Sequence, residues 1–135
     1  MRRFATALLF ITLIATSYAK TRHAPLPNGL LSAKTVFLEN KTGYQSALDT
    51  AYDQFQKWGR FSIVQDKDSA DIVVVLVHDS GMREGTTIGF TQMNVFLKGN
   101  DQPVFETTER FRSKLFGNSS VKQCVKDFKK RLESK

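Results

Sequence analysis

The stretch that decides the fold of this chain is Ile72-Val73-Val74-Val75-Leu76-Val77. All six side chains are apolar, and every one except Leu76 is β-branched. Such side chains fit a pleated strand. A strand that is apolar on both sides is typical of the middle of a sheet whose two faces are covered, or nearly so. The sequence therefore predicts a central strand at residues 72–77.

Further strands are predicted on both sides of this central one. They cover residues 33–39, 60–65, 86–97 and 103–110. Turn signals at Asp79-Ser80-Gly81 and at Gly99-Asn100-Asp101 separate the last three strands. Within residues 86–97 the apolar alternation slips between Phe90 and Met93. The slip predicts either a bulge near Thr91 or an exposed first half of this strand.

Two amphipathic helices complete the pattern. Thr42 and Gln45 have the spacing of a capping box at the start of the first helix, and Gly59 is placed to end it. Ser120 and Gln123 repeat the capping pattern before the second. The apolar stripe of the first helix is Tyr44, Ala47, Leu48, Ala51, Tyr52, Phe55 and Trp58, and that of the second is Val121, Cys124, Val125, Phe128 and Leu132. We expect a buried Cys124 thiol and Trp58 at the core or its rim.

The elements follow one another in the order β-α-β-β-β-β-α. Two helices, each with one apolar face, over a single mixed sheet define a two-layer α+β sandwich. Residues 33–135 are enough for one such domain. Residues 20–32 show no periodicity and contain Pro25, Pro27 and Asn28-Gly29, so they predict an extended lead-in.

The first nineteen residues have the three-part layout of a secretory signal peptide. Arg2 and Arg3 precede an apolar run, and Ser17-Tyr18-Ala19 supplies small residues before Lys20. We expect cleavage after Ala19 and export to the periplasm or the medium, with no transmembrane segment in the mature chain. Retention of residues 1–19 as an uncleaved anchor is the alternative.

Positive charge is concentrated at one end of the chain. Residues 20–109 carry nine Lys or Arg against eleven Asp or Glu, whereas residues 110–135 carry nine against two. This segment is a possible contact for an anionic lipid, a polysaccharide or an acidic protein. Export argues against nucleic acid. A solvated helix face is the plainer interpretation. The basic residues concerned are Arg110, Arg112, Lys114, Lys122, Lys126, Lys129, Lys130 and Arg131.

No motif in the sequence carries a known catalytic or cofactor chemistry. His78 and Asp79 follow the central strand, where α/β proteins often place ligand groups. No nucleophile or metal partner is apparent for His78, and a strand-end histidine is the plainer interpretation. Asp66, Asp68 and Asp71 are spaced like the start of a calcium loop but lack its glycine and distal glutamate. We therefore expect no cofactor, no metal and no enzymatic activity.

Residues 36–43, 59–64 and 70–74 together resemble a group of bacterial envelope domains. In that group a strand ending in Asn-x-Thr-Gly precedes a helix, a Gly-Arg-Phe strand follows, and Ala-Asp opens the central strand. The group includes the N-terminal domain of TolB, the curli-secretion lipoproteins and the lipoprotein activators of penicillin-binding proteins. The Lys57–Phe61 segment is also similar to small secreted bacterial proteins of unknown function.

The resemblance implies a periplasmic protein-contact role without an active site in this region. With the signal peptide, it leads to the expectation of an exported, non-enzymatic envelope interaction module. The first alternative is an anionic-surface binder that uses the basic C-terminal region. The second is an enzyme of unknown type with His78 near its site.

Overall fold

The computed structural model describes residues 24–107, 110–111 and 119–134. The predicted signal peptide lies outside the described residues, as do Arg112 and Lys114. Among the described residues, no helix is long and apolar enough to cross a membrane.

A mixed six-stranded sheet forms one layer of the molecule. Its strand order is β2-β1-β3-β4-β5, and β6 pairs with β4 beside β5. β1 runs parallel to β2 and β3, and the other pairs are antiparallel. The strands are β1 (Thr35–Lys41), β2 (Ser62–Ile63), β3 (Ile72–Arg83), β4 (Thr86–Leu97), β5 (Phe105–Glu106) and β6 (Arg110–Phe111). The predicted apolar stretch is therefore the middle strand of the sheet.

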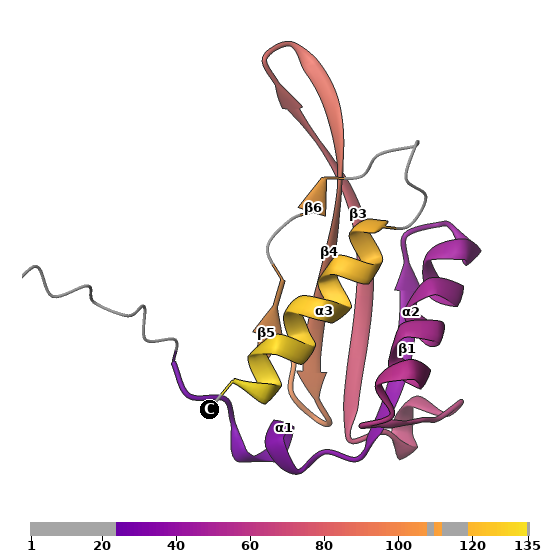
Figure 1. The fold of residues 1–135 in the computed structure, drawn as a ribbon, viewed down its shortest axis with the longest axis vertical. Helices are drawn as coiled ribbons and strands as arrows, with labels where there is room; N and C mark the ends of the chain where they lie inside the picture. Colours follow the sequence, from indigo (N-terminus) through magenta and orange to yellow (C-terminus); the bar gives the residue numbers. More distant parts are fainter. Residues whose placement is uncertain (1–23, 108–109, 112–118, 135) are drawn as a thin grey trace, which may run out of the picture.

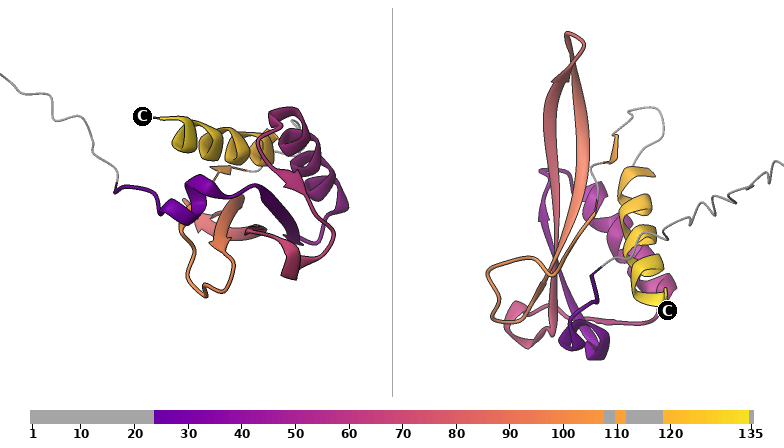
Figure 2. Two further views of the ribbon diagram at one scale, coloured as in Figure 1. Left: turned by 90° about the horizontal axis from the view of Figure 1, so that it is seen from below. Right: turned by 90° about the vertical axis from the view of Figure 1, so that its left-hand side faces the viewer.

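The second layer consists of α2 (Gln45–Trp58) and α3 (Ser119–Glu133), which lie side by side on one face of the sheet (Figures 1 and 2). The predicted two-layer α+β class is confirmed. The core lies between the layers, and its largest fully buried side chains include Phe55, Phe128, Ile72, Leu76 and Met93. Cys124 is also fully buried, as its position on the stripe of α3 predicted.

The opposite face of the sheet carries no helix of the second layer (Figure 2). The short helix η1 (Lys67–Ser69) and the loop after β4 lie at one end of it. Val73 and Val75 point to this open face, yet each is only 7% exposed. The helices cover one face of β3, and side chains of neighbouring strands surround Val73 and Val75 on the other. Both faces of the central strand are therefore buried, which explains why it is apolar throughout.

β3 and β4 form a longer hairpin than predicted. Their register runs without interruption from Ile72↔Leu97 to Arg83↔Thr86, so the predicted bulge near Thr91 is wrong. The predicted turn at residues 79–81 is also wrong, because these residues continue β3. The turn lies at Glu84-Gly85, where both φ angles are positive, +49° and +77°, as a tight type I′ hairpin requires.

The apolar alternation of β4 slips between Phe90 and Met93, where its apolar side chains change from one face of the sheet to the other. Met93 and Val95 face the helix layer, whereas Phe90 faces the other side. Between them, Thr91 occupies a helix-facing position and is fully buried, and its Oγ1 hydrogen-bonds Ser120 Oγ at 2.9 Å. The predicted alternative, edge exposure of the first half of β4, holds only for its outer part: Thr87 is exposed and Ile88 and Gly89 are partly buried, whereas Phe90 and Thr91 are buried.

Both predicted capping boxes differ from the structure. Tyr44, not Thr42, precedes α2. Thr42 Oγ1 instead accepts from the Tyr44 amide at 3.1 Å and donates to Asn40 Oδ1 at 2.6 Å, which builds the turn before the helix. Ser120 is the second residue of α3 and bonds Thr91 across the core. The Gly59 cap is confirmed, since Gly59 has φ +69° and its N–H donates to the Phe55 carbonyl.

Two other segments differ from their predicted form. The lead-in contains a one-turn helix, α1 (Asn28–Ser32), because Leu30 enters the core and is fully buried. The last predicted strand, residues 103–110, is reduced to the two short strands β5 and β6. Thr107 lies between them, and its hydroxyl and amide both bond Met93 of β4.

Candidate functional site

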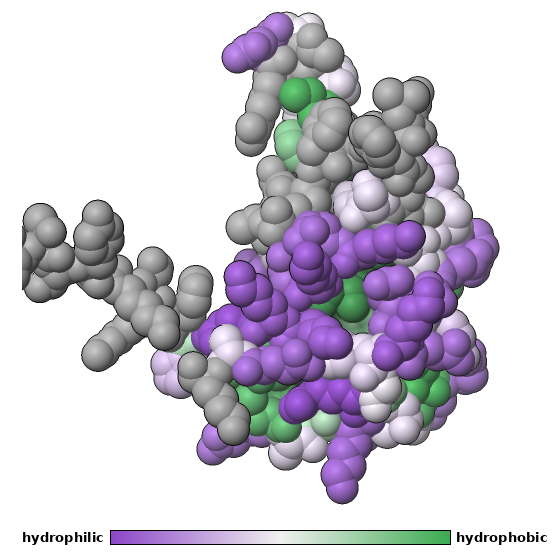
Figure 3. Space-filling model, viewed as in Figure 1, coloured by the Kyte–Doolittle hydropathy of each residue, from purple (hydrophilic) through white to green (hydrophobic). Residues whose placement is uncertain are grey.

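A groove of about 330 Å³ runs between α2 and α3 on the outer side of the helix layer. We call it the lysine groove. Hydrophilic side chains gather over these two helices in the space-filling view (Figure 3). The described residues that line it include four lysines and no acid: Gln54, Lys57, Trp58, Ser119, Lys122, Gln123, Val125, Lys126 and Lys129.

Helical spacing places these lysines in a row. Lys122, Lys126 and Lys129 are separated by four and three residues, so they share one face of α3. The apolar stripe on the adjoining face holds α3 against the sheet and α2, and Val125 is buried under the groove. Lys57, in the last turn of α2, supplies the fourth ammonium group.

Trp58 forms an aromatic wall of the lysine groove. Its ring meets Phe61 and Phe128 edge-on, with centroid distances of 5.2 and 5.6 Å. Its Nε1 donates to Glu133 Oε1 at 3.0 Å. The predicted position of Trp58 at the rim of the core is confirmed, and both contacts hold the indole in one orientation.

The charges of this groove are only partly compensated. Lys57 Nζ lies 2.7 Å from Asp53 Oδ2. The hydrogen bond from Lys57 is the main reason why the pKa of Asp53 is below its usual value, and the charge of Lys122 adds to the shift. Lys126 and Lys129 have no ion-pair partner in the part of the chain that the structure describes.

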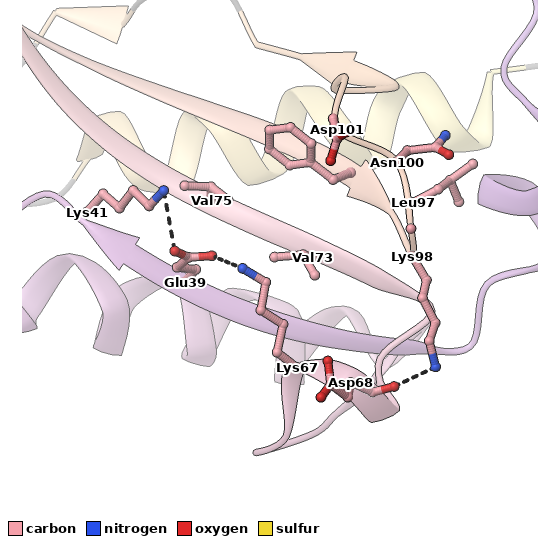
Figure 4. A pocket seen from close by; sticks show the side chains of 12 residues that line it. Glu39, Lys41, Lys67, Asp68, Val73, Val75, Leu97, Lys98, Asn100 and Asp101 are labelled. Carbon is pink, nitrogen blue, oxygen red and sulfur yellow. Dashed lines mark hydrogen bonds and ion pairs between the residues drawn. The ribbon is translucent and has the colours of Figure 1, made fainter.

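A second groove, of about 400 Å³, lies on the open face of the sheet (Figure 4). We call it the open-face groove. Val73 and Val75 form its floor. Glu39 accepts from Lys67 at 2.8 Å and lies 3.4 Å from Lys41, and the bond from Lys67 is the main cause of its lowered pKa. Lys98 Nζ donates to the Asp68 carbonyl at 2.5 Å. Glu39, Lys41 and Lys67 are thus paired with one another, whereas the Asp68 and Asp101 carboxylates form no ion pair with described residues.

The outer part of the β3–β4 hairpin projects beyond the rest of the sheet (Figures 1 and 2). β1 accompanies β3 only as far as Val77, and β6 accompanies β4 only from Phe90. Among the described residues, 80–83 and 86–89 therefore pair only with each other. Met82 on this projection is 77% exposed. One outer amide, that of Ser80, is taken by Asp79 Oδ1 at 2.7 Å.

The structure does not bring His78 and Asp79 together. They are neighbours on β3, so their side chains point to opposite faces of the sheet. The His78 ring lies 5.5 Å from that of Tyr44, at the start of α2, and Asp79 binds the Ser80 amide. The expectation that they end the central strand is wrong, because β3 continues to Arg83.

The structure places only some of the predicted basic residues around the lysine groove. Lys122, Lys126 and Lys129 line the lysine groove, whereas Lys130 does not. Arg131 donates to the Ala24 carbonyl, and Arg110 is in β6. Sequence reasoning missed Lys57, because no sequence pattern indicates which helix faces of a sandwich become neighbours.

Of the three aspartates weighed as a calcium loop, Asp66 and Asp71 have structural roles through their carboxylates, and Asp68 bonds through its backbone. Asp66 accepts from the Asp68 amide at 3.1 Å and caps η1. Asp71 Oδ2 accepts from the Lys34 and Thr35 amides at 2.8 and 3.0 Å, and Thr35 Oγ1 accepts from the Asp71 amide. Asp71 thus ties the starts of β1 and β3 together. The described residues contain no cluster of three or more groups that could hold a metal ion.

Comparison with known proteins finds similarity to solved structures only. The sequence matches no protein-family model and no curated protein. The chain is similar to the crystal structure of the rare lipoprotein B from Shewanella oneidensis, with 15% identity and a TM-score of 0.39. The alignment covers 75% of this chain and 92% of that one. A similarity at this level carries no argument about function.

Proposed function

We propose that this chain is an exported, non-enzymatic interaction module of a bacterial envelope. The observation that carries the proposal is the projecting hairpin. None of its outer residues whose side chains are described belongs to the core, yet four register pairs extend the hairpin beyond Asp79↔Phe90. A two-stranded ribbon on its own is only marginally stable. Its backbone edges can add a strand from another protein.

A shortened hairpin tests this proposal. Deleting residues 80–83 and 86–89 joins Asp79 and Phe90 through the native Glu84-Gly85 turn. In the native chain the pair Arg83↔Thr86 flanks the turn. Asp79↔Phe90 is four residues further along each strand, so it has the same place in the alternation of antiparallel hydrogen bonds and can flank the turn in its stead. We expect unfolding free energy close to that of the native chain and loss of the proteins captured from the native envelope. Equal capture by both chains would contradict the role of the hairpin.

Export itself is testable by intact-mass measurement. The layout of residues 1–19 predicts that the exported chain begins at Lys20. A soluble exported species that still contains Met1–Ala19 would overturn this part of the proposal.

The second candidate function is binding to an anionic surface through the basic residues of α3. The specific observation in its favour is that Lys57 of α2 joins Lys122, Lys126 and Lys129 around one groove. Exposed ionic contacts are screened over about 10 Å at 0.1 M salt, so capture through this groove should weaken steeply as salt rises. Capture that does not change with salt would exclude it.

A further inference from the structure

We infer that the lysine groove binds an acidic segment of another polypeptide, in which an apolar residue is flanked by carboxylates. This inference rests on the second candidate function and names its ligand. Three features support it: the uncompensated charge of the lysines, their spread along α3 and the apolar side chains that line the groove.

The charge of the groove favours an anionic occupant. Lys122, Lys126 and Lys129 stand at i, i+4 and i+7, so each is next to a like charge on the helix surface. Like charges at this spacing destabilise a helix. The fold does not compensate them, since Lys126 and Lys129 form no ion pair with described residues. A carboxylate placed between successive lysines would relieve this repulsion.

The arrangement of the lysines favours several linked anions over one compact anion. At a rise of 1.5 Å per residue, Lys122 and Lys129 are about 10 Å apart along the axis of α3. A single phosphate could contact all three ammonium groups only if their side chains converged, whereas a peptide can offer one carboxylate to each. The four lysines also come from both sides of the groove, because Lys57 belongs to α2.

The apolar wall distinguishes a polypeptide from a charged membrane. Trp58 and Val125 line the groove beneath the lysines. Val125 is buried, but Trp58 is only partly buried and offers contact area to an apolar side chain of the ligand. Asp53 and Glu133 border the same region, the first bound to Lys57 and the second to Trp58. These carboxylates would repel a continuous anionic surface, but a peptide in the groove can pass between them.

Trp58 provides a direct readout, because it is the single tryptophan of the chain. The probe is a 15-residue peptide of repeated Glu-Glu-Leu units, titrated at low salt while the Trp58 emission is recorded. We expect a saturable emission change with this peptide and none with its Gln-Gln-Leu counterpart. Inorganic phosphate, and vesicles of phosphatidylcholine and phosphatidylglycerol at 7:3, are titrated in parallel.

Two triple variants with the same loss of charge separate the groove from net charge. K122Q/K126Q/K129Q removes the row on α3, and K41Q/K67Q/K98Q removes three lysines of the open-face groove. We expect the first to weaken peptide binding at least tenfold and the second to change it less than twofold. Circular dichroism and the unfolding midpoint show whether each variant is folded.

The outcomes distinguish this inference from the function on which it rests. Equal peptide affinity of both variants would overturn the peptide site. If the vesicles bind and depend on the α3 lysines while the peptide does not, the anionic-surface function stands and the polypeptide ligand is wrong. If none of the three anions binds the native chain, both are wrong.

Discussion

The two faces of the sheet use their charged residues in opposite ways. On the open face, Glu39 lies between Lys41 and Lys67, and Lys98 is bound to a backbone carbonyl. On the helix side, four lysines line one groove, and among the described residues only Lys57 has a carboxylate within ion-pair distance. On the open face, the Glu39–Lys67 pair joins β1 to η1. Lys126 and Lys129 form no such pair with described residues, which is why we propose recognition there.

The difference extends to the core under each face. The helix side covers an aromatic cluster in which Phe128 meets Phe55, Trp58, Phe61 and Phe105 at centroid distances of 5.1 to 6.4 Å. The open face has a floor of valines with half-buried Phe96 beside them. We therefore expect most of the stabilising burial to lie on the side that carries the unpaired lysines.

The largest expected effect comes from replacing Phe128 with Ala. This change leaves a cavity at the centre of the aromatic cluster and should lower the unfolding free energy by about 3–5 kcal/mol. Phe96→Ala is the matched control, because it removes the same atoms from the open face, where the ring is only partly buried. Urea unfolding of both variants measures the difference. A loss for Phe96→Ala as large as that for Phe128→Ala would show that the two faces contribute equally.

The second prediction concerns the buried hydrogen bonds of Thr107 with Met93 of β4 and Cys124 of α3, which we call the polar seam. Thr107 Oγ1 accepts from the Met93 amide at 2.9 Å and donates to Cys124 Sγ at 3.4 Å. Thr107→Val leaves the buried Met93 amide without this acceptor and should cost about 1–3 kcal/mol. Thr87→Val, an exposed site on the projecting hairpin, should change the unfolding free energy by less than about 0.5 kcal/mol. A near-neutral Thr107→Val would mean that the seam is not needed to hold α3.

The third prediction uses pH and the end of the sheet where β1 and β3 begin. The Lys34 and Thr35 amides, which donate to its carboxylate, lower the pKa of Asp71 below its usual value. Because the folded pKa is the lower one, this stabilisation is present above about pH 4 and is lost as pH falls through the folded pKa. Asp71→Asn should therefore lower the urea midpoint at pH 7 and make little difference at the lowest pH at which the chain stays folded. An equal loss at both pH values would show that the carboxylate charge is not involved.

Sequence periodicity was sufficient to predict the sheet and helix layers of this fold but not the ends of its helices. The run at residues 72–77 and the stripes of the two helices identify the central strand, the helix faces and the burial of Cys124, because these depend on local spacing alone. The caps depended on contacts outside the helices. Thr42 bonds Asn40, and Ser120 bonds Thr91, which lies 29 residues away in the sequence.

The candidate sites show the same limit. The row of lysines on α3 follows from helical spacing, so three of its members were predicted. The groove, however, needs α2, and the proximity of Lys57 to α3 is a property of the packed sandwich. The projecting hairpin could not be predicted from the sequence for another reason. Asp79-Ser80-Gly81 has the composition of a turn, and only pairing with β4 makes it a strand.

The smallest expected effect tests whether the charged residues of the two faces of the sheet differ in their contribution to stability. K122Q/K126Q/K129Q removes two like-charge contacts on α3, each worth about 0.2–0.5 kcal/mol at such spacings, so it should leave stability unchanged or raise it slightly. Lys67→Gln removes an ion pair with Glu39 and should lower stability by up to about 1 kcal/mol, since both groups are partly exposed. Urea midpoints at 20 mM and 500 mM salt measure both changes, and screening should reduce each of them. If instead the α3 variant were the less stable one, its lysines would have a structural role and would no longer indicate a binding site.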